Sequence, residues 1–213
     1  MEEARMWAGV ERARLRLADL LEDLPTRDWE RPSLCAGWRI RDVAAHLAGN
    51  AQFGAGDWFR EALRARGRFN RMIGDSARRL ATESPGSLVA QLREHAASRK
   101  VPPAPGAGPD STIMDVLTHT QDIALALGRE PEVPPEDAVA GLGSLWKLRF
   151  PFNPRKRLAG LRLVASDADW AVGAGPEVRG PASGFLLLLT NRPAAYERLS
   201  GPGLDLARAK QAA

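Results

Sequence analysis

The sequence predicts an α+β fold that is mostly α, with a helical bundle over residues 1–135 and a small α/β domain over residues 136–213. Three observations lead to this prediction. Apolar residues recur at helical spacing in the first part, short strand-like segments follow in the second part, and loops rich in proline and glycine separate the elements. Because so small a tail would be marginal alone, we expect it to dock on the bundle.

Four segments of the first part are predicted to be helices, because their apolar residues recur every three or four positions. They cover residues 5–24, 40–66, 87–99 and 111–127. Pro25 ends the first segment, a kink is expected near Gly54 in the second, and Asp110 or Ser111 forms the N-cap of the fourth. Gly128 follows the fourth helix as its C′ residue. Four helices with long connections predict an antiparallel bundle.

The second part of the chain is predicted to hold a short helix, three strands and a closing helix. The helix lies near residues 136–148, and the strands lie in "LRLVAS", "WAVG" and "EVRG". "PASGFLLLLTNRP" then forms a compact helix that ends before Pro193, and "ARAKQAA" is a low-complexity tail.

Composition describes a soluble globular protein with a substantial core. The 213 residues are 44% hydrophobic and 26% charged, and the longest apolar run, "FLLLL", is far shorter than a membrane span. The charged N-terminus has no apolar centre typical of a signal peptide. Cys35 is the single cysteine, so no internal disulfide can form. We therefore expect a cytoplasmic protein with no membrane partner.

The positive charge of the chain comes almost wholly from arginine. The net charge is +4, and the basic runs "REALRARGRFNR" and "RFPFNPRKR" could contact phosphates. Both runs lack the aromatic pattern and the helix-turn-helix signature of nucleic-acid-binding proteins, so solvated surface is favoured. We expect no nucleic-acid partner, and the sequence leaves a monomer and a homodimer equally open.

Two helices carry side chains that could bind one metal ion. Asp115 and His119 are four residues apart and therefore lie on the same face of a helix. His46 lies at the edge of the apolar stripe of another helix and points inward. Two nitrogen ligands and one oxygen ligand suit Zn²⁺ or a similar divalent ion, with a fourth position open to water or substrate.

Each of these residues also has a purely structural interpretation. His46 could be a hydrogen-bonded interior histidine, and Asp115 and His119 could form an ion pair that stabilises the helix. His95 could be a further ligand or a packing residue, with packing favoured. Cys35 is interpreted as a small buried residue. Spacing alone leaves the metal site and these alternatives open.

Three segments of the sequence resemble one known family. "LCAGWRIRDVAAHLAG" and "MDVLTHTQDIALALG" are similar to two motifs of the mycothiol-dependent maleylpyruvate isomerase family, and "VRGPASGFLLLLTNR" resembles its C-terminal segment. The resemblance implies a DinB-like four-helix bundle followed by a small sterol-carrier-like α/β domain. It also implies a divalent metal, usually zinc, bound at the positions of His46, Asp115 and His119. Asp115 stands where the family more often has glutamate.

The same resemblance implies chemistry at the metal. The family metal is understood to activate the thiol of mycothiol, the low-molecular-weight thiol of actinobacteria. Arg192 aligns with a family arginine that faces the active site, where a guanidinium could bind a substrate carboxylate in bidentate fashion. A cation that stabilises a helix C-terminus is the structural alternative for Arg192. No residue of this sequence identifies the cofactor-binding positions for mycothiol itself.

The leading functional hypothesis is a metal-dependent and mycothiol-dependent thiol transferase or cis–trans isomerase. Its substrate would be a small electrophile, with carboxylate-bearing compounds among the candidates. Two alternatives stay open at this point. One is a non-catalytic binding protein on a degenerate bundle, and the other is a metal-dependent hydrolase that uses the open position for water.

Overall fold

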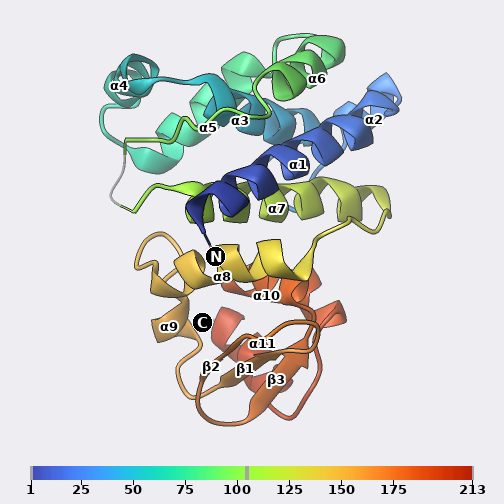
Figure 1. Cartoon of the computed structure of the whole chain (residues 1–213), viewed down its shortest axis with the longest axis vertical. Helices are drawn as coiled ribbons and strands as arrows, with labels where there is room; N and C mark the ends of the chain where they lie inside the picture. Colours follow the sequence, from blue (N-terminus) through green and yellow to red (C-terminus); the bar gives the residue numbers. More distant parts are fainter. Residues whose placement is uncertain (1, 104–105, 213) are drawn as a thin grey trace. The chain divides into compact units, whose positions relative to one another are not determined.

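The computed structural model describes residues 2–103 and 106–212, which form two compact units (Figure 1). The first unit contains the residues up to Thr112 together with His119–Pro131, and the second contains Ile113–Thr118 together with the residues from Glu132 onward. One helix, α7 (Pro109–Ala124), therefore contributes to both units. The structure is mostly α with one small sheet, so the predicted fold class is confirmed.

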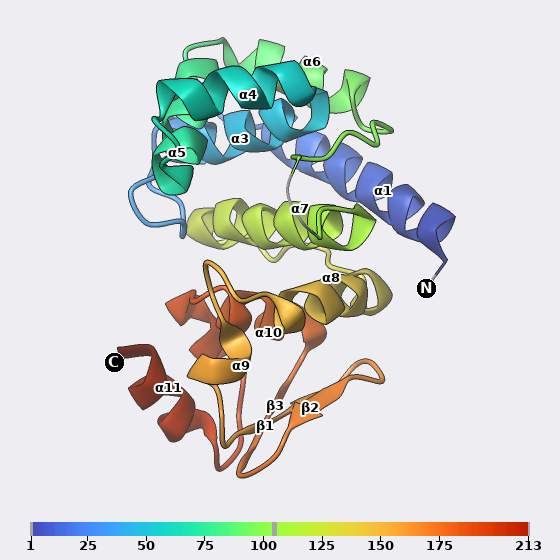
Figure 2. The ribbon, with the colours of Figure 1, turned by 90° about the vertical axis from the view of Figure 1, so that its left-hand side faces the viewer.

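Helix α3 is the central element of the first unit (Figure 2). The other elements of this unit are α1 (Glu3–Glu22), α2 (Thr26–Trp29), α4 (Ala55–Arg64), α5 (Phe69–Leu80), α6 (Pro85–Glu94), part of α7 and the 3-10 turn η1 (Leu125–Leu127). Helix α3 (Ile40–Gln52) packs against both α5 and α6, and α6 also packs against α1. Alanines 44, 45, 48 and 51 of α3 are buried, so neighbouring helices can approach its backbone closely from several sides.

The first unit has more helices than the sequence predicts. The segment predicted as one kinked helix is divided into α3 and α4, because Phe53 is extended and Gly54 is the N-cap of α4. Helices α2 and α5 were not predicted. Helix α5 does carry apolar residues at helical spacing, and this pattern was missed: Phe69, Met72, Ile73, Ala77 and Leu80.

A buried arginine fixes the end of α6. Arg14 of α1 is 1% exposed, and its Nη1 donates to the main-chain oxygens of His95 at 3.3 Å, Ala96 at 3.0 Å and Ser98 at 2.7 Å. These oxygens belong to the C-cap of α6 and to the segment that follows it, and the guanidinium group holds that segment against α1. Helix α6 ends at Glu94, earlier than predicted, and packs against α1.

The ends of α7 correct one prediction and confirm another. The N-cap is Gly108, so neither Asp110 nor Ser111 occupies that position. Ser111 lies inside the first turn, where its Oγ accepts from the Gly108 N–H at 2.9 Å. Gly128 ends the following 3-10 turn with a φ of 70°, a left-handed conformation that glycine adopts at little cost.

The second unit contains a three-stranded sheet with strand order β2-β1-β3 (Figure 1). Its elements are α8 (Pro135–Lys147), α9 (Pro154–Arg157), β1 (Arg162–Ala165), β2 (Ala171–Gly173), β3 (Glu177–Gly180), α10 (Ala182–Leu189), η2 (Pro193–Glu197) and α11 (Leu204–Ala212). Strand β1 is antiparallel to β2 and parallel to β3, with Leu163 opposite Val178. All three predicted strands are thus present, and α11 occupies the segment predicted as a low-complexity tail.

Helix α10 is the core of the second unit. Every residue of α10 is buried, and the helix packs against α8 and η2. Phe185 also contacts Trp170, with ring centroids 5.3 Å apart. The Asp167 carboxylate accepts from the Ala182 N–H at 2.8 Å and so satisfies one donor at the start of α10. None of the helices among the described residues has the length and apolar character needed to span a membrane.

Candidate metal centre

The first turn of α3 is anchored by a buried carboxylate. Asp42 is 3% exposed and accepts from the main-chain N–H of Arg39 at 2.9 Å and from its guanidinium at 2.9 and 3.0 Å. Burial alone would raise the pKa of Asp42, but the hydrogen bonds from Arg39 outweigh burial and hold this pKa below its usual value of 3.8. This carboxylate therefore fixes the start of the helix that carries His46 one turn later.

The lowered pKa makes a pH prediction for Asp42→Asn. A carboxyl group with a lowered pKa stabilises the folded state above its unfolded pKa, and this stabilisation is lost as pH falls through the folded pKa. We expect the substitution to lower the free energy of unfolding by about 1 to 3 kcal/mol at pH 7. Denaturant unfolding of both proteins from pH 7 to pH 2 checks this, since the difference should shrink below pH 3.8. A difference that stays constant over this range would contradict the assignment.

Three aromatic rings meet beside the start of α3. His46 on α3 is 7% exposed, and its ring centroid lies 5.1 Å from that of His119 on α7, with the rings at 78°. Trp38, from the loop before α3, contacts the edge of His46 at 5.3 Å and stacks parallel to His119 at 6.2 Å. The indole therefore packs against both histidines and limits the orientations available to them.

Asp115 completes a set of three ligand atoms. Asp115 lies one turn before His119 in the continuous helix α7, so the helix fixes their relative position. His46, Asp115 and His119 each offer one ligand atom, and these atoms lie within 4.8 Å of one another. A tetrahedral ion with bonds of about 2.0–2.1 Å needs its ligand atoms about 3.3 Å apart, so small side-chain rotations would complete the site. The donor set fits a divalent ion.

A second carboxylate orients His119. Asp122 is 0% exposed, and its Oδ2 lies 2.8 Å from Nδ1 of His119. When Asp122 is ionised its carboxylate can only accept, and this contact then holds the imidazole proton on Nδ1 and leaves Nε2 for a metal. The main-chain oxygen of Asp122 also accepts from the Leu34 N–H at 3.1 Å. The sequence analysis did not assign a role to Asp122, although a carboxylate three residues after His119 is a usable signal.

We expect Asp122→Asn to weaken zinc binding by about 10- to 100-fold, because metal affinity depends on the group that orients a histidine ligand. Competition with a chromophoric chelator measures this affinity. Asp42→Asn is the matched control, since it also neutralises a buried carboxylate of the first unit but contacts no candidate ligand. Equal zinc affinity of the Asp122→Asn variant and the unsubstituted protein would show that Asp122 has no orienting role.

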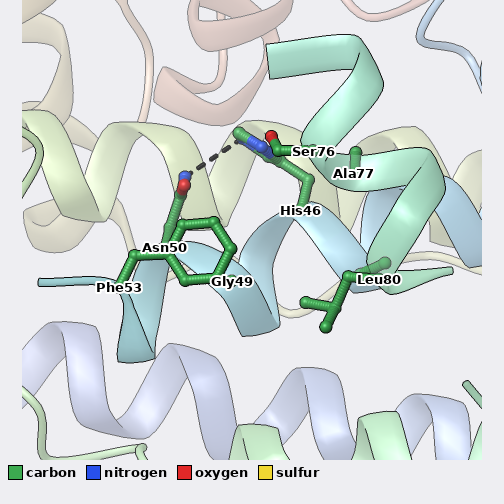
Figure 3. Close-up of a pocket in the computed structure, with 8 residues that line it drawn as sticks. His46, Gly49, Asn50, Phe53, Ser76, Ala77 and Leu80 are labelled. Atoms are coloured by element: carbon green, nitrogen blue, oxygen red, sulfur yellow. Dashed lines mark hydrogen bonds between the residues drawn. The ribbon is translucent and has the colours of Figure 1, made fainter. Parts of the chain in front are cut away.

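His46 has a polar partner on its own helix. Asn50 lies one turn later on α3, and its side-chain nitrogen is 3.1 Å from Nε2 of His46. Figure 3 shows both side chains at a depression between α3 and α5, next to Phe53, Ser76 and Leu80. The depression is too narrow to hold a water molecule. It is a packing feature beside the ligand set and offers no room for a substrate.

The remaining candidate residues occupy different places. Arg192 follows α10, is 9% exposed and donates from Nη1 to the Thr190 main-chain oxygen at 2.9 Å. His95 is the C-cap of α6 and joins neither ligand group found among the described residues. Cys35 is half-buried, so its interpretation as a small buried residue was wrong. It lies near His119 instead, as described below.

The fold and the side-chain grouping define a class: a helical bundle with candidate ligands for a divalent ion, followed by a small α/β unit. The chain belongs to the mycothiol maleylpyruvate isomerase family, because the family model described as "Mycothiol maleylpyruvate isomerase N-terminal domain" matches residues 10–124. The family takes its name from an enzyme that depends on mycothiol.

Two solved structures share the fold of the whole chain. Both are of the mycothiol-dependent maleylpyruvate isomerase, one of them a histidine-to-alanine mutant. The mutant has a TM-score of 0.59 and the other structure 0.56, each at 14% identity over 95% of this chain and 93% of the other. Likeness at this identity establishes the fold, and no curated protein matches the sequence.

Proposed function

We propose that this protein is a metal-dependent enzyme that uses mycothiol to transfer a thiol to, or to isomerise, a small electrophilic substrate. The observation that carries the proposal is the grouping of His46, Asp115 and His119, with Asp122 behind His119. Membership of a mycothiol-dependent family supports the choice of thiol. A cytoplasmic location agrees with a chemistry that needs a reduced thiol.

The three candidate ligands would hold a divalent ion, for which Zn²⁺ is the first choice. Such an ion, when bound, lowers the pKa of a coordinated thiol and so supplies a thiolate near neutral pH. Asp122 keeps the proton of His119 on Nδ1, so that Nε2 remains an unprotonated donor. Trp38 stacks parallel to the His119 ring and meets the His46 ring edge-on, and so limits the orientations of both rings. Asp115 is one methylene shorter than glutamate and therefore holds its oxygen closer to α7.

The substrate side of the proposal concerns Arg192. A thiolate adds to an electrophilic carbon and either stays as a conjugate or leaves again after rotation about the former cis double bond. A planar guanidinium can bind a carboxylate of such a substrate through two parallel hydrogen bonds. Arg192 is nine-tenths buried and already donates to a main-chain oxygen, which restricts its conformation. We assign it to substrate binding on its similarity to the family arginine.

Thermal unfolding of the zinc-loaded protein with added thiols tests the proposed function. A ligand present at 100 times its dissociation constant stabilises the folded state by about 2.7 kcal/mol, so mycothiol should raise Tm by about 5–10 °C. Glutathione should have a smaller effect, and the His46→Ala protein should respond to neither thiol. A protein stabilised by no thiol would support a binding protein or a hydrolase. Turnover of an electrophile that proceeds equally well without thiol would identify the hydrolase.

A further inference from the structure

A second set of ligand atoms meets at His119. Cys35, His119 and Asp122 each offer one ligand atom, and these atoms lie within 4.8 Å of one another. All three residues belong to the first unit. The loop that carries Cys35 is tied to α7 by the hydrogen bond from Leu34 to Asp122, and the Cys35 N–H donates to Ser33 Oγ at 3.1 Å. The thiol is therefore held beside α7 by its own loop.

We propose that Cys35, His119 and Asp122 form a second cation site for a thiophilic divalent ion, for which Cd²⁺ is the probe. A thiolate, an imidazole nitrogen and a carboxylate oxygen are donors that such an ion accepts, and the thiolate favours the softer ion. The distance from His119 Nδ1 to Asp122 Oδ2 is 2.8 Å. An ion bonded to both atoms requires about 3.3 Å between them, which a rotation of either side chain provides.

Binding at this set has a definite proton balance. The Cys35 thiol loses its proton to solvent and becomes a thiolate ligand, and the single imidazole proton of His119 moves from Nδ1 to Nε2. The imidazole nitrogen Nε2, which is needed with His46 and Asp115, is then protonated and cannot bind a second ion. Occupation of the two sites is therefore mutually exclusive. This competition rests on the proposed function, whereas the second site itself does not.

Cadmium titration of the metal-free, full-length protein tests the second site. Because Cys35 is the only cysteine, the ultraviolet charge-transfer absorption of a cadmium–thiolate bond reports this residue alone. The cadmium–thiolate absorption should stop rising at one equivalent of Cd²⁺ per chain, both in the unsubstituted protein and in His46→Ala. It should be absent in Cys35→Ser, whose zinc affinity should be unchanged. Asp122→Asn should weaken the cadmium affinity by about 10-fold or more.

Two results would overturn the second site. One is the lack of any thiolate absorption in the unsubstituted protein. The other is equal cadmium affinity in the unsubstituted, Asp122→Asn and His119→Ala proteins, since Cys35 would then bind the ion as an isolated thiol. Where a variant folds poorly, the ¹¹³Cd chemical shift of the unsubstituted protein decides whether Cys35 is a ligand. Mixed sulfur, nitrogen and oxygen ligation gives a different chemical shift from sulfur-free ligation. If the cadmium site is intact but the zinc-loaded protein is not stabilised by mycothiol, only the proposed function is contradicted.

Discussion

His46→Ala is expected to leave the purified protein without bound zinc. The substitution removes one of three ligands, and Asp115 and His119 alone would hold the ion at least about 100-fold more weakly. Elemental analysis after dialysis should give one zinc per chain for the unsubstituted protein and none for the variant. The loss should occur without unfolding, which the far-ultraviolet circular dichroism spectrum checks.

His95→Ala provides the matched control for this experiment. The chain has three histidines, and His95 caps α6 outside both ligand groups of the described residues. Its substitution removes the same imidazole group and should leave the zinc content unchanged. A His46→Ala protein that retains a full equivalent of zinc, or a His95→Ala protein that loses it, would refute the ligand assignment.

Arg14→Met should have the largest effect on stability. Methionine keeps most of the apolar stem but cannot donate to the three main-chain oxygens that Arg14 satisfies at the end of α6. A buried carbonyl without a donor costs about 1–3 kcal/mol. The bonds to His95 and Ser98 are partly buried, and the Ser98 N–H also donates to the His95 oxygen, so we expect a total loss of about 2–4 kcal/mol. For a chain of this length the loss corresponds to a fall in Tm of about 10 °C, measurable by differential scanning calorimetry.

Arg5→Met is the control for the loss of a positive charge from α1. Arg5 is exposed on the same helix, and surface substitutions of this kind change stability by about 0.5 kcal/mol or less. The zinc content of Arg14→Met should remain one per chain at temperatures where the protein is folded. An Arg14→Met protein within 1 kcal/mol of the unsubstituted protein would show that other donors satisfy the end of α6.

Long apolar runs predict some elements of the fold directly, whereas one amphipathic helix and several helix boundaries were missed. The run "FLLLL" identifies α10 directly, since a helix apolar on all sides must be buried. Helix α5 was missed although its apolar residues recur at helical spacing, at Phe69, Met72, Ile73, Ala77 and Leu80. The division of α3 from α4 depends on the backbone of Phe53 and Gly54, which hydrophobic periodicity does not report.

The candidate site is predictable only in part for a related reason. Helical spacing places Asp115 and His119 on one face, whereas the 5.1 Å approach of His46 to His119 depends on how α3 and α7 pack. Sequence reasoning gave no role to Trp38 or Asp122, because stacking and the orientation of a histidine follow from the tertiary structure. The resemblance to a family supplied the ligand set that spacing alone left open.

X-ray absorption spectroscopy of the zinc-loaded protein, without added thiol, tests the central claim most directly. The account predicts an ion bound by the imidazoles of His46 and His119 and by an oxygen of Asp115, all at about 2.0–2.2 Å. The spectrum should show scattering from two imidazole rings and no sulfur neighbour. A sulfur atom at about 2.3 Å, or fewer than two imidazoles, would contradict this ligand set and place the ion elsewhere.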